Sequence, residues 1–303
     1  MTRRSRRVRR ARASTPGVAT TAWHNPEPDK NSAQVLIGTP SLGLIRLEWA
    51  TAMESMVKPP NWSVAKSTPI GYPVGPAQNM IVDACLRGPF RALLLIEDDT
   101  VPPPDALLTF DRWFFKMERK MAPPVISGCY HIKGSEEIRR GDKGGIAMLG
   151  AEPLIYRGGG LRAFRDFTYG DVVWCNGIPT GALLIHRSVL EAWAREPDVP
   201  MDTIPGYPHP VKRVFEQPSR VWQEPNGAFK SMSGTTDLYW SEQTMKRDIL
   251  TKAGFGKYAK REFPYIVDTS LRFGHIDRST GAVTQGGPAG SRADGRPVRT
   301  KAA

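Results

Sequence analysis

An apolar run that ends in three consecutive acids constrains this chain more than any other feature. Residues 93–96 are aliphatic, residues 97–99 are acidic, and three prolines at 102–104 mark the start of a helix. A short apolar run bounded in this way predicts a buried strand. In open α/β sheets ligands bind beyond the carboxyl ends of the strands. The acids therefore predict a site for Mg²⁺ or Mn²⁺ beside a phosphate, and a solvated acidic turn before a helix is the alternative.

Length and composition set the class of protein. The chain has 303 residues, 40% of them hydrophobic, and eight tryptophans, which is enough for a substantial core. No apolar run approaches 18 residues and no apolar segment follows the basic start, so we expect neither a membrane span nor a secretory signal. Cys85, Cys129 and Cys175 are odd in number and widely spaced. They predict buried free thiols in a reducing compartment, the cytoplasm (the host's cytoplasm if the chain is phage-encoded).

The net charge of +12 is concentrated at the two ends of the chain. Residues 1–33 contribute +6, with seven arginines between positions 3 and 12, and residues 279–303 contribute +3. Both segments lack apolar periodicity and predict disordered tails. The arginine block would attract a polyanion with salt-sensitive affinity. A tail that only improves solubility is the alternative.

Strand and helix patterns alternate over residues 34–130. This order predicts a Rossmann-like α/β half with parallel strands. The first strand–helix turn, residues 38–43, lacks both G-x-G-x-x-G and G-x-x-x-x-G-K-[ST], which argues against dinucleotide-dependent dehydrogenases and P-loop enzymes. The predicted strands span 35–39, 62–67, 93–97 and 125–130, and the predicted helices span 42–56, 76–85 and 107–117.

The second half, residues 131–278, has a more irregular pattern. Residues 131–175 predict short strands and long loops, and residues 197–234 predict a lid or binding loop because they hold many prolines and glycines with little periodicity. Regular elements are predicted as a buried strand at 182–185, an amphipathic helix at 238–253 and a strand at 265–267.

These motifs together resemble the GT-A-type glycosyltransferases. The acids at 97–99 stand where that family has its D-x-D motif, with Glu97 in place of the first aspartate. The resemblance implies one domain at 34–278, with a nucleotide-sugar half at 34–130 and an acceptor half at 131–278. It covers residues 34–277 and rests on motifs in the family's order at 35–40, 77–82, 97–99, 180–187, 236–237 and 267–275.

The resemblance also implies which residues form the site. Mn²⁺ or Mg²⁺ would be held by Asp99, Glu97 and His275. Asp237 would be the catalytic base, with Glu242 as its substitute. The nucleotide-sugar donor would contact Thr39, Pro40, Gln78, Asn79, Glu97 and Asp98.

The chemistry explains why these residue types belong together. A leaving nucleoside diphosphate gains negative charge, which a divalent ion can neutralise. The acceptor hydroxyl needs a base, for which Asp237 is the candidate. Helix N-capping is the alternative role for Asp237, and an ordinary loop histidine is the alternative for His275.

The sequence therefore predicts a metal-dependent glycosyltransferase. Among GT-A-type enzymes, the chain is similar to phage-borne DNA glycosyltransferases associated with TET/base-J oxygenases, which implies a hydroxymethylated base in DNA as one acceptor. Two other functions are kept as alternatives, a sugar-nucleotide pyrophosphorylase and a non-catalytic module that binds polyanions. The sequence leaves the sugar, the nucleotide, the acceptor, the stereochemical outcome and the oligomeric state unassigned.

Overall fold

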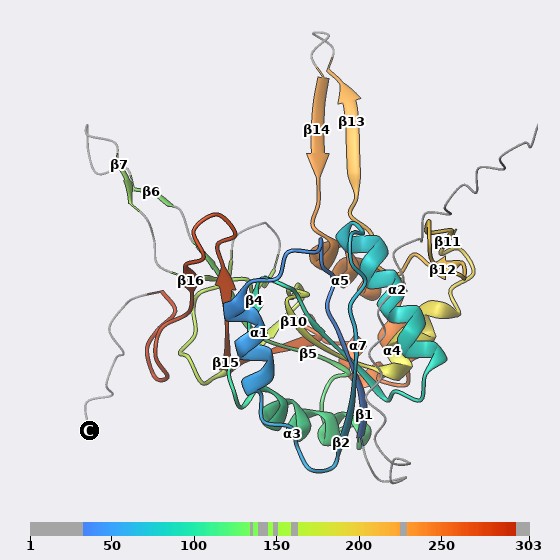
Figure 1. Cartoon of the computed structure of the whole chain (residues 1–303), viewed down its shortest axis with the longest axis horizontal. Helices are drawn as coiled ribbons and strands as arrows, with labels where there is room; N and C mark the ends of the chain where they lie inside the picture. Colours follow the sequence, from blue (N-terminus) through green and yellow to red (C-terminus); the bar gives the residue numbers. More distant parts are fainter. Residues whose placement is uncertain are drawn as a thin grey trace, which may run out of the picture.

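The computed structural model shows an α/β protein built around one large mixed sheet (Figure 1). It describes residues 33–133, 136–138, 145–147, 151–158, 163–224 and 229–294. The predictions for residues 1–32 and 295–303, including the arginine block, lie outside the described residues.

The main path of the central sheet consists of seven strands within the described residues, five of which run in one direction. Its path is β16 (Val283–Thr284), β15 (Tyr265–Ile276), β5 (Val125–Lys133), β10 (Ala182–His186), β3 (Ala92–Ile96), β1 (Ala33–Gly38) and β2 (Trp62–Ser67). β1 is parallel to β2 and β3, β5 is parallel to β15, and β10 is antiparallel to both of its neighbours. Three short strands join at the margins, β4 (Thr100–Val101), β8 (Ala151–Pro153) and β9 (Val172–Cys175).

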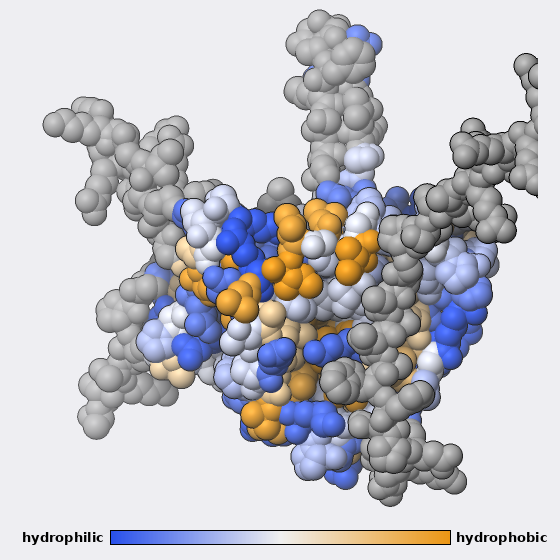
Figure 2. Space-filling model, viewed as in Figure 1, coloured by the Kyte–Doolittle hydropathy of each residue, from blue (hydrophilic) through white to orange (hydrophobic). Residues whose placement is uncertain are grey.

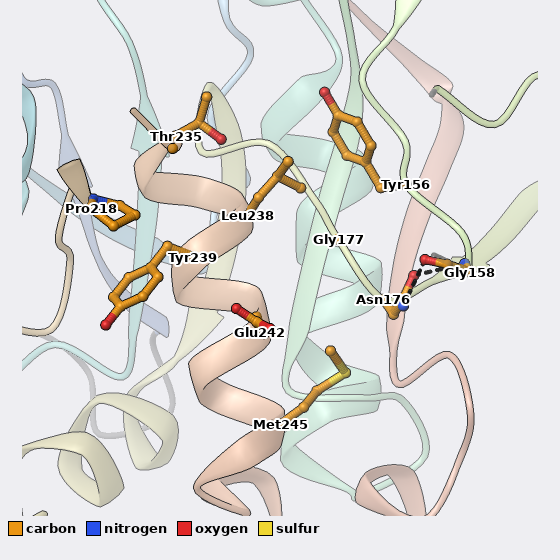
Figure 3. A pocket seen from close by; sticks show the side chains of 11 residues that line it. Tyr156, Gly158, Asn176, Gly177, Pro218, Thr235, Leu238, Tyr239, Glu242 and Met245 are labelled. Atoms are coloured by element: carbon orange, nitrogen blue, oxygen red, sulfur yellow. Dashed lines mark hydrogen bonds between the residues drawn. The ribbon is translucent and has the colours of Figure 1, made fainter. Parts of the chain in front are cut away.

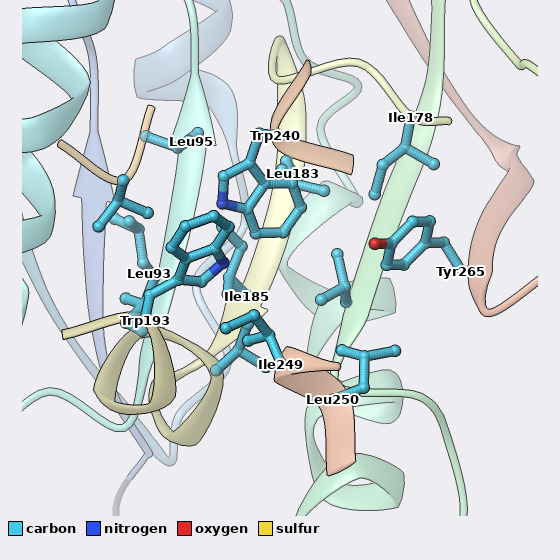
Figure 4. Close-up of a cluster of buried hydrophobic side chains, with 14 of the residues drawn as sticks. Leu93, Leu95, Ile178, Leu183, Ile185, Trp193, Trp240, Ile249, Leu250 and Tyr265 are labelled. Atoms are coloured by element: carbon cyan, nitrogen blue, oxygen red, sulfur yellow. The ribbon is translucent and has the colours of Figure 1, made fainter. Parts of the chain in front are cut away.

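Helices cover both faces of the sheet. Side chains alternate along a strand, so Leu93 and Leu95 pack on one face while Leu94 and Ile96 pack on the other. Because both faces are buried, the strand is apolar throughout and not alternating. Part of the first face is drawn in Figure 4. This face packs against α2 (Val74–Arg87), α4 (Arg187–Ala194), α5 (Thr236–Lys246), α6 (Ile249–Lys252) and α7 (Gly256–Ala259). The second face packs against α1 (Leu47–Ser55) and α3 (Ala106–Glu118).

The predicted Rossmann-like half is confirmed in its order of elements, β1-α1-β2-α2-β3. The strand predicted at 62–67 has the bounds of β2, and β1, β3 and β5 lie where strands are predicted. The first helix is shorter than predicted. It begins at Leu47, after Gly43 with a φ of 109° and Arg46 in an extended conformation, and Leu42 and Ile45 are 64% and 44% exposed instead of forming a helical face.

The second half contains more regular structure than its composition indicates. Residues 197–234 form two hairpins, β11–β12 (Met201–Asp202 and Val211–Lys212) and β13–β14 (Ser219–Gln223 and Phe229–Ser233), and the second hairpin projects far from the body in Figure 1. A further pair is β6–β7 (Glu136–Ile138 and Gly145–Ala147). The single helix predicted at 238–253 is divided, because Asp248 adopts a left-handed φ of 51° between α5 and α6.

The prediction of disorder from residue 279 onward needs correction for residues 279–294. Val283 and Thr284 form β16 on the edge of β15. Farther along, Tyr169 N donates to Ser291 O (2.9 Å) and Ala293 N donates to Phe167 O (3.0 Å). This order comes from main-chain hydrogen bonds to distant segments, which need no apolar periodicity in the segment itself.

Two expectations from composition can be compared with the fold. The three cysteines are buried and free, as predicted, and burial raises the pKa of Cys85 to about 12. None of the helices in the described ranges is long and apolar enough to cross a membrane.

Candidate functional site at the acidic end of the sheet

The last strand brings the far end of the chain against the three acids. Near its carboxyl end β15 pairs with β4, with His275 opposite Thr100. Ile276 N then donates to Asp99 O at 2.8 Å. We call Glu97, Asp98, Asp99, His275 and Arg278 the acidic site.

Arg278 is the cation that the structure places on the acids. Its Nη2 donates to Asp98 Oδ1 at 2.6 Å and its Nε donates to Asp99 Oδ2 at 3.2 Å. The Asp98 side chain is only 3% exposed. The second oxygens, Asp98 Oδ2 and Asp99 Oδ1, are buried without a hydrogen-bond partner. A buried carboxylate oxygen without a partner is costly, so the site is incomplete without a further cation or donor.

Glu97 occupies a different environment from its two neighbours. Its Oε1 accepts a hydrogen bond from Thr180 Oγ1 (2.8 Å), and its carbonyl accepts one from Trp49 Nε1 (2.8 Å). Burial, reinforced by the charge of Asp99, raises the pKa of Glu97 to about 7. The backbone next to Thr180 is closely packed, because a Cβ added at the neighbouring Gly181 would lie 3.0 Å from Thr100 Oγ1. Glu97 therefore has a hydrogen-bond donor within the protein, in contrast to the second oxygens of Asp98 and Asp99.

His275 lies beside Asp99, as the predicted metal set requires. Its Nε2 is 3.5 Å from Asp99 Oδ2. Burial alone would raise the pKa of Asp99, but the hydrogen bonds and positive charges of His275 and Arg278 lower it below the usual value. No group of three or more histidine, cysteine or acidic side chains is arranged to hold a metal in the described part of the chain. The predicted set of Asp99, Glu97 and His275 is thus brought close without forming a three-ligand cage.

Two cavities flank the contact between Asp98 and Arg278, and both residues line each of them. One, of about 290 Å³, is also lined by Pro40, Tyr72 and Glu97, and the other, of about 430 Å³, by Leu42, Leu44, Ile45 and Asp99. Figure 2 shows hydrophobic residues gathered on the face crossed by the loop between β1 and α1, next to strongly hydrophilic ones. An aromatic ring, a cation and carboxylates thus surround a recess at the carboxyl end of the strands.

Three of the predicted donor contacts have structural partners or are deeply buried. Thr39 is 2% exposed and its N donates to Ser67 O (2.9 Å). Asn79 donates to Phe215 O (2.9 Å) and accepts from Phe215 N (2.7 Å), so its amide holds a loop. Gln78 is fully buried and both polar atoms of its side chain lack a hydrogen-bond partner. Thr39, Gln78 and Asn79 do not line either of the two cavities beside Asp98. Pro40, which was also predicted to contact the donor, does line one of them.

Asp237 lies in the first turn of α5 and does not cap it. The N-cap residue is Thr235, so the capping alternative for Asp237 needs correction. Its Oδ1 accepts from Leu238 N at 2.8 Å. Burial raises the pKa of Asp237, and its negative charge in turn helps to raise the pKa of Glu97. Asp237 therefore shares the electrostatic environment of the acidic site although it comes from the other half of the chain.

Glu242, the substitute base, faces a separate cavity. This cavity, of about 570 Å³, is lined along α5 by Thr235, Leu238, Tyr239 and Glu242 and on the opposite side by Tyr156 (Figure 3). Five residues along a helix correspond to a rotation of about 140° between the side chains at 237 and 242. Glu242 is also paired with Lys246 at 2.7 Å. The structure thus separates the two candidate bases.

Sequence reasoning missed two partners of the acids, Thr180 and Arg278. Arg278 is the last residue of the predicted domain and has no motif of its own. An available signal was the turn that follows, in which Asp277 Oδ1 accepts from Ser279 N (2.8 Å) and Thr280 N (3.2 Å). Aspartate followed by serine and threonine is typical of such a turn, and this one fixes the backbone next to Arg278.

Comparisons with known proteins show little similarity. No family model matches the chain, and no curated protein sequence matches it. Among solved structures, one titled "Crystal Structure of A197 from STIV" is similar to this chain with 13% identity and a TM-score of 0.41, covering 86% of this chain and 97% of that one. A likeness this weak carries no information on activity.

Proposed function

We propose that this protein is a nucleotide-sugar-dependent glycosyltransferase with a GT-A-like fold, and that the acidic site binds the diphosphate of the donor. The observation that carries the proposal is the pair of buried, partnerless oxygens, Asp98 Oδ2 and Asp99 Oδ1, at the carboxyl end of a parallel strand. Ligands of open α/β sheets bind at this edge. Cavities on both sides of Asp98 leave room for a nucleotide.

A divalent ion suits the two orphan oxygens. Mg²⁺ is usually held by one or two carboxylates, with substrate phosphates and water completing its shell, so Asp98 and Asp99 are sufficient and His275 is the adjacent nitrogen. When bound, the ion supplies positive charge for the departing diphosphate. Arg278 contributes a second positive charge, and its side chain is 54% exposed, so the N–H groups that do not bind Asp98 or Asp99 can donate to a phosphate.

Asp237 is the proposed base. In the reaction the bond between the sugar's anomeric carbon and the diphosphate oxygen breaks, and a bond forms between that carbon and the acceptor oxygen. The acceptor's proton passes to Asp237, and the nucleoside diphosphate leaves with the electron pair. A carboxylate whose pKa is raised is a better base near neutral pH than an ordinary one, and burial raises the pKa of Asp237.

The test is release of nucleoside diphosphate from a panel of nucleotide sugars in the presence of Mn²⁺, with and without candidate acceptors. The acceptors include a hydroxymethylated oligonucleotide, a glycan and a peptide. Asp99→Asn should lower release by about 10³-fold. Asp248→Asn, which changes an exposed aspartate between α5 and α6, should leave release unchanged. If no nucleotide sugar is turned over by the wild-type protein, the proposal is wrong.

The same assay separates the alternatives. A pyrophosphorylase would release pyrophosphate from a nucleoside triphosphate and a sugar phosphate, and would leave a nucleotide sugar intact when pyrophosphate is absent. A non-catalytic module would turn over neither mixture.

A further inference from the structure

A further cavity lies at the opposite end of the sheet. Its volume is about 600 Å³, within the range of ligand sites. It includes Ile266 near the start of β15, whereas His275 near the end of that strand belongs to the acidic site. Nine positions of extended chain correspond to roughly 25–30 Å. We call its three rings and three cations the basic groove: Trp113, Lys116, Trp174, Lys257, Tyr258 and Arg261.

Aromatic rings hold the cations of the basic groove in place. The Arg261 guanidinium lies 3.7 Å from the centre of the Trp174 ring, whose plane is stacked with that of Tyr258 at 6.2 Å and 19°. Lys116 Nζ lies 4.4 Å from the centre of the Trp113 ring. Both distances are within the range of cation–π contacts. A guanidinium stacked on a ring keeps its N–H groups free at its edge, where they can bind a phosphate.

The positive charge of the basic groove is not neutralised by acids. Lys257 Nζ lies 4.8 Å from the Tyr258 ring, and within the described ranges none of the three cations forms a salt bridge. All three are exposed. Asp268, which touches the groove through Trp113, accepts hydrogen bonds from Trp113 Nε1 (2.7 Å) and from the N and Oγ of Ser270 (3.0 and 2.6 Å). Three oriented cations without carboxylate partners form a site for anions.

We propose that the basic groove binds the phosphate groups of a single-stranded nucleic acid. Cations spread around one recess can contact successive phosphates of a flexible strand. Phosphate contacts supply the sequence-independent part of nucleic-acid binding. This site does not depend on the proposed transferase activity, because it lies at the other end of the sheet.

The test is fluorescence anisotropy of the full chain with a labelled single-stranded oligonucleotide at several salt concentrations. The groove variant changes three cations: Lys116→Gln, Lys257→Gln and Arg261→Gln. The control variant removes the same charge at exposed positions outside the groove: Lys58→Gln, Lys66→Gln and Arg195→Gln. Because the groove variant neutralises three fewer phosphates, its log–log salt slope should fall in magnitude by about two, and the slope of the control should stay near the wild-type value.

Equal changes in both variants, or no change in the groove variant, would overturn the proposal. Titration with inorganic phosphate and pyrophosphate separates the sources of the anion. If the groove variant loses affinity for these small anions and keeps its affinity for the oligonucleotide, the nucleic-acid assignment is wrong. Thermal unfolding checks that the variants fold, and the double variant Lys116→Gln, Lys257→Gln replaces the triple one if Arg261 is needed for folding.

Discussion

The two ends of the central sheet carry clusters of opposite charge, and the charged groups have different kinds of partner at each end. At the carboxyl end, carboxylates gather and are partly neutralised by Arg278, yet Asp98 and Asp99 each keep a buried oxygen without a partner. At the amino end, cations gather and rest on aromatic rings. The first site lacks positive charge and the second lacks negative charge.

This difference indicates ligands of different kinds. Buried acids need a compact cation and leave room for the phosphates that accompany it. Exposed cations on rings keep their full charge and suit an extended anion. The direction of the chain separates the two charge clusters. The acids follow β3 at the carboxyl end of the sheet, and α3 then runs back toward the amino end, where Trp113 and Lys116 lie.

The largest expected effect is at Asp99. Asp99→Asn keeps the shape of the side chain and removes its charge, so transfer should fall by about 10³-fold, the scale of a lost electrostatic contact in a transition state. Initial rates of nucleoside diphosphate release measure it, with Asp248→Asn as the control. A variant within fivefold of wild type would show that the acidic end is not the reactive one.

The next effect separates the two carboxylates of α5. Asp237→Asn should lower turnover by about 10²-fold with little change in donor affinity, because it removes a proton acceptor. Glu242→Gln, on another face of the helix, should stay within a few-fold of wild type. If Glu242→Gln lowered turnover more than Asp237→Asn, the base would be Glu242, in the cavity lined by Tyr156 and Tyr239.

Arg278→Gln tests whether the acidic end lacks positive charge. It leaves the buried Asp98 carboxylate unpaired, which should lower the free energy of unfolding by about 2 kcal/mol after allowance for the exposure of Arg278. Added Mn²⁺ should then stabilise this variant more than the wild type. Denaturant unfolding with and without Mn²⁺ measures both effects, and a variant as stable as wild type in the absence of metal would contradict the ion pair.

The smallest effect concerns pH. Burial raises the pKa of Glu97 from 4.5 to about 7, so between these values the folded protein binds a proton that the unfolded chain has released. Stability from this group is full below pH 4.5 and is lost as the pH rises toward 7. Relative to Glu97→Gln, the wild type should therefore lose about 1 kcal/mol for each pH unit across this range. A constant difference across the range would contradict the raised pKa.

The sequence predicted the parts of the fold that depend on local pattern. Residues 93–96 are apolar throughout because both faces of β3 are covered, and the acids that follow mark its carboxyl end. Arg278 could not be predicted in its role, because its position depends on the pairing of β15 with β4, two segments far apart in the chain. The basic groove is predictable only in part. Trp113 and Lys116 lie one turn apart on a helix that periodicity predicts, but Arg261 meets Trp174 through tertiary packing, and Lys257 lies in a four-residue helix that no periodicity reveals.

The most direct test compares thermal unfolding of three proteins, the wild type, Asp99→Asn and the groove variant, with a panel of nucleoside diphosphates in the presence and absence of Mn²⁺. If the nucleotide binds at the acidic end with a metal, one diphosphate at 100 times its Kd should raise the Tm of the wild type and the groove variant by about 5 °C, only with Mn²⁺. Asp99→Asn should show no shift. An equal shift in Asp99→Asn, or its loss in the groove variant, would contradict the assignment of the nucleotide to the acidic site.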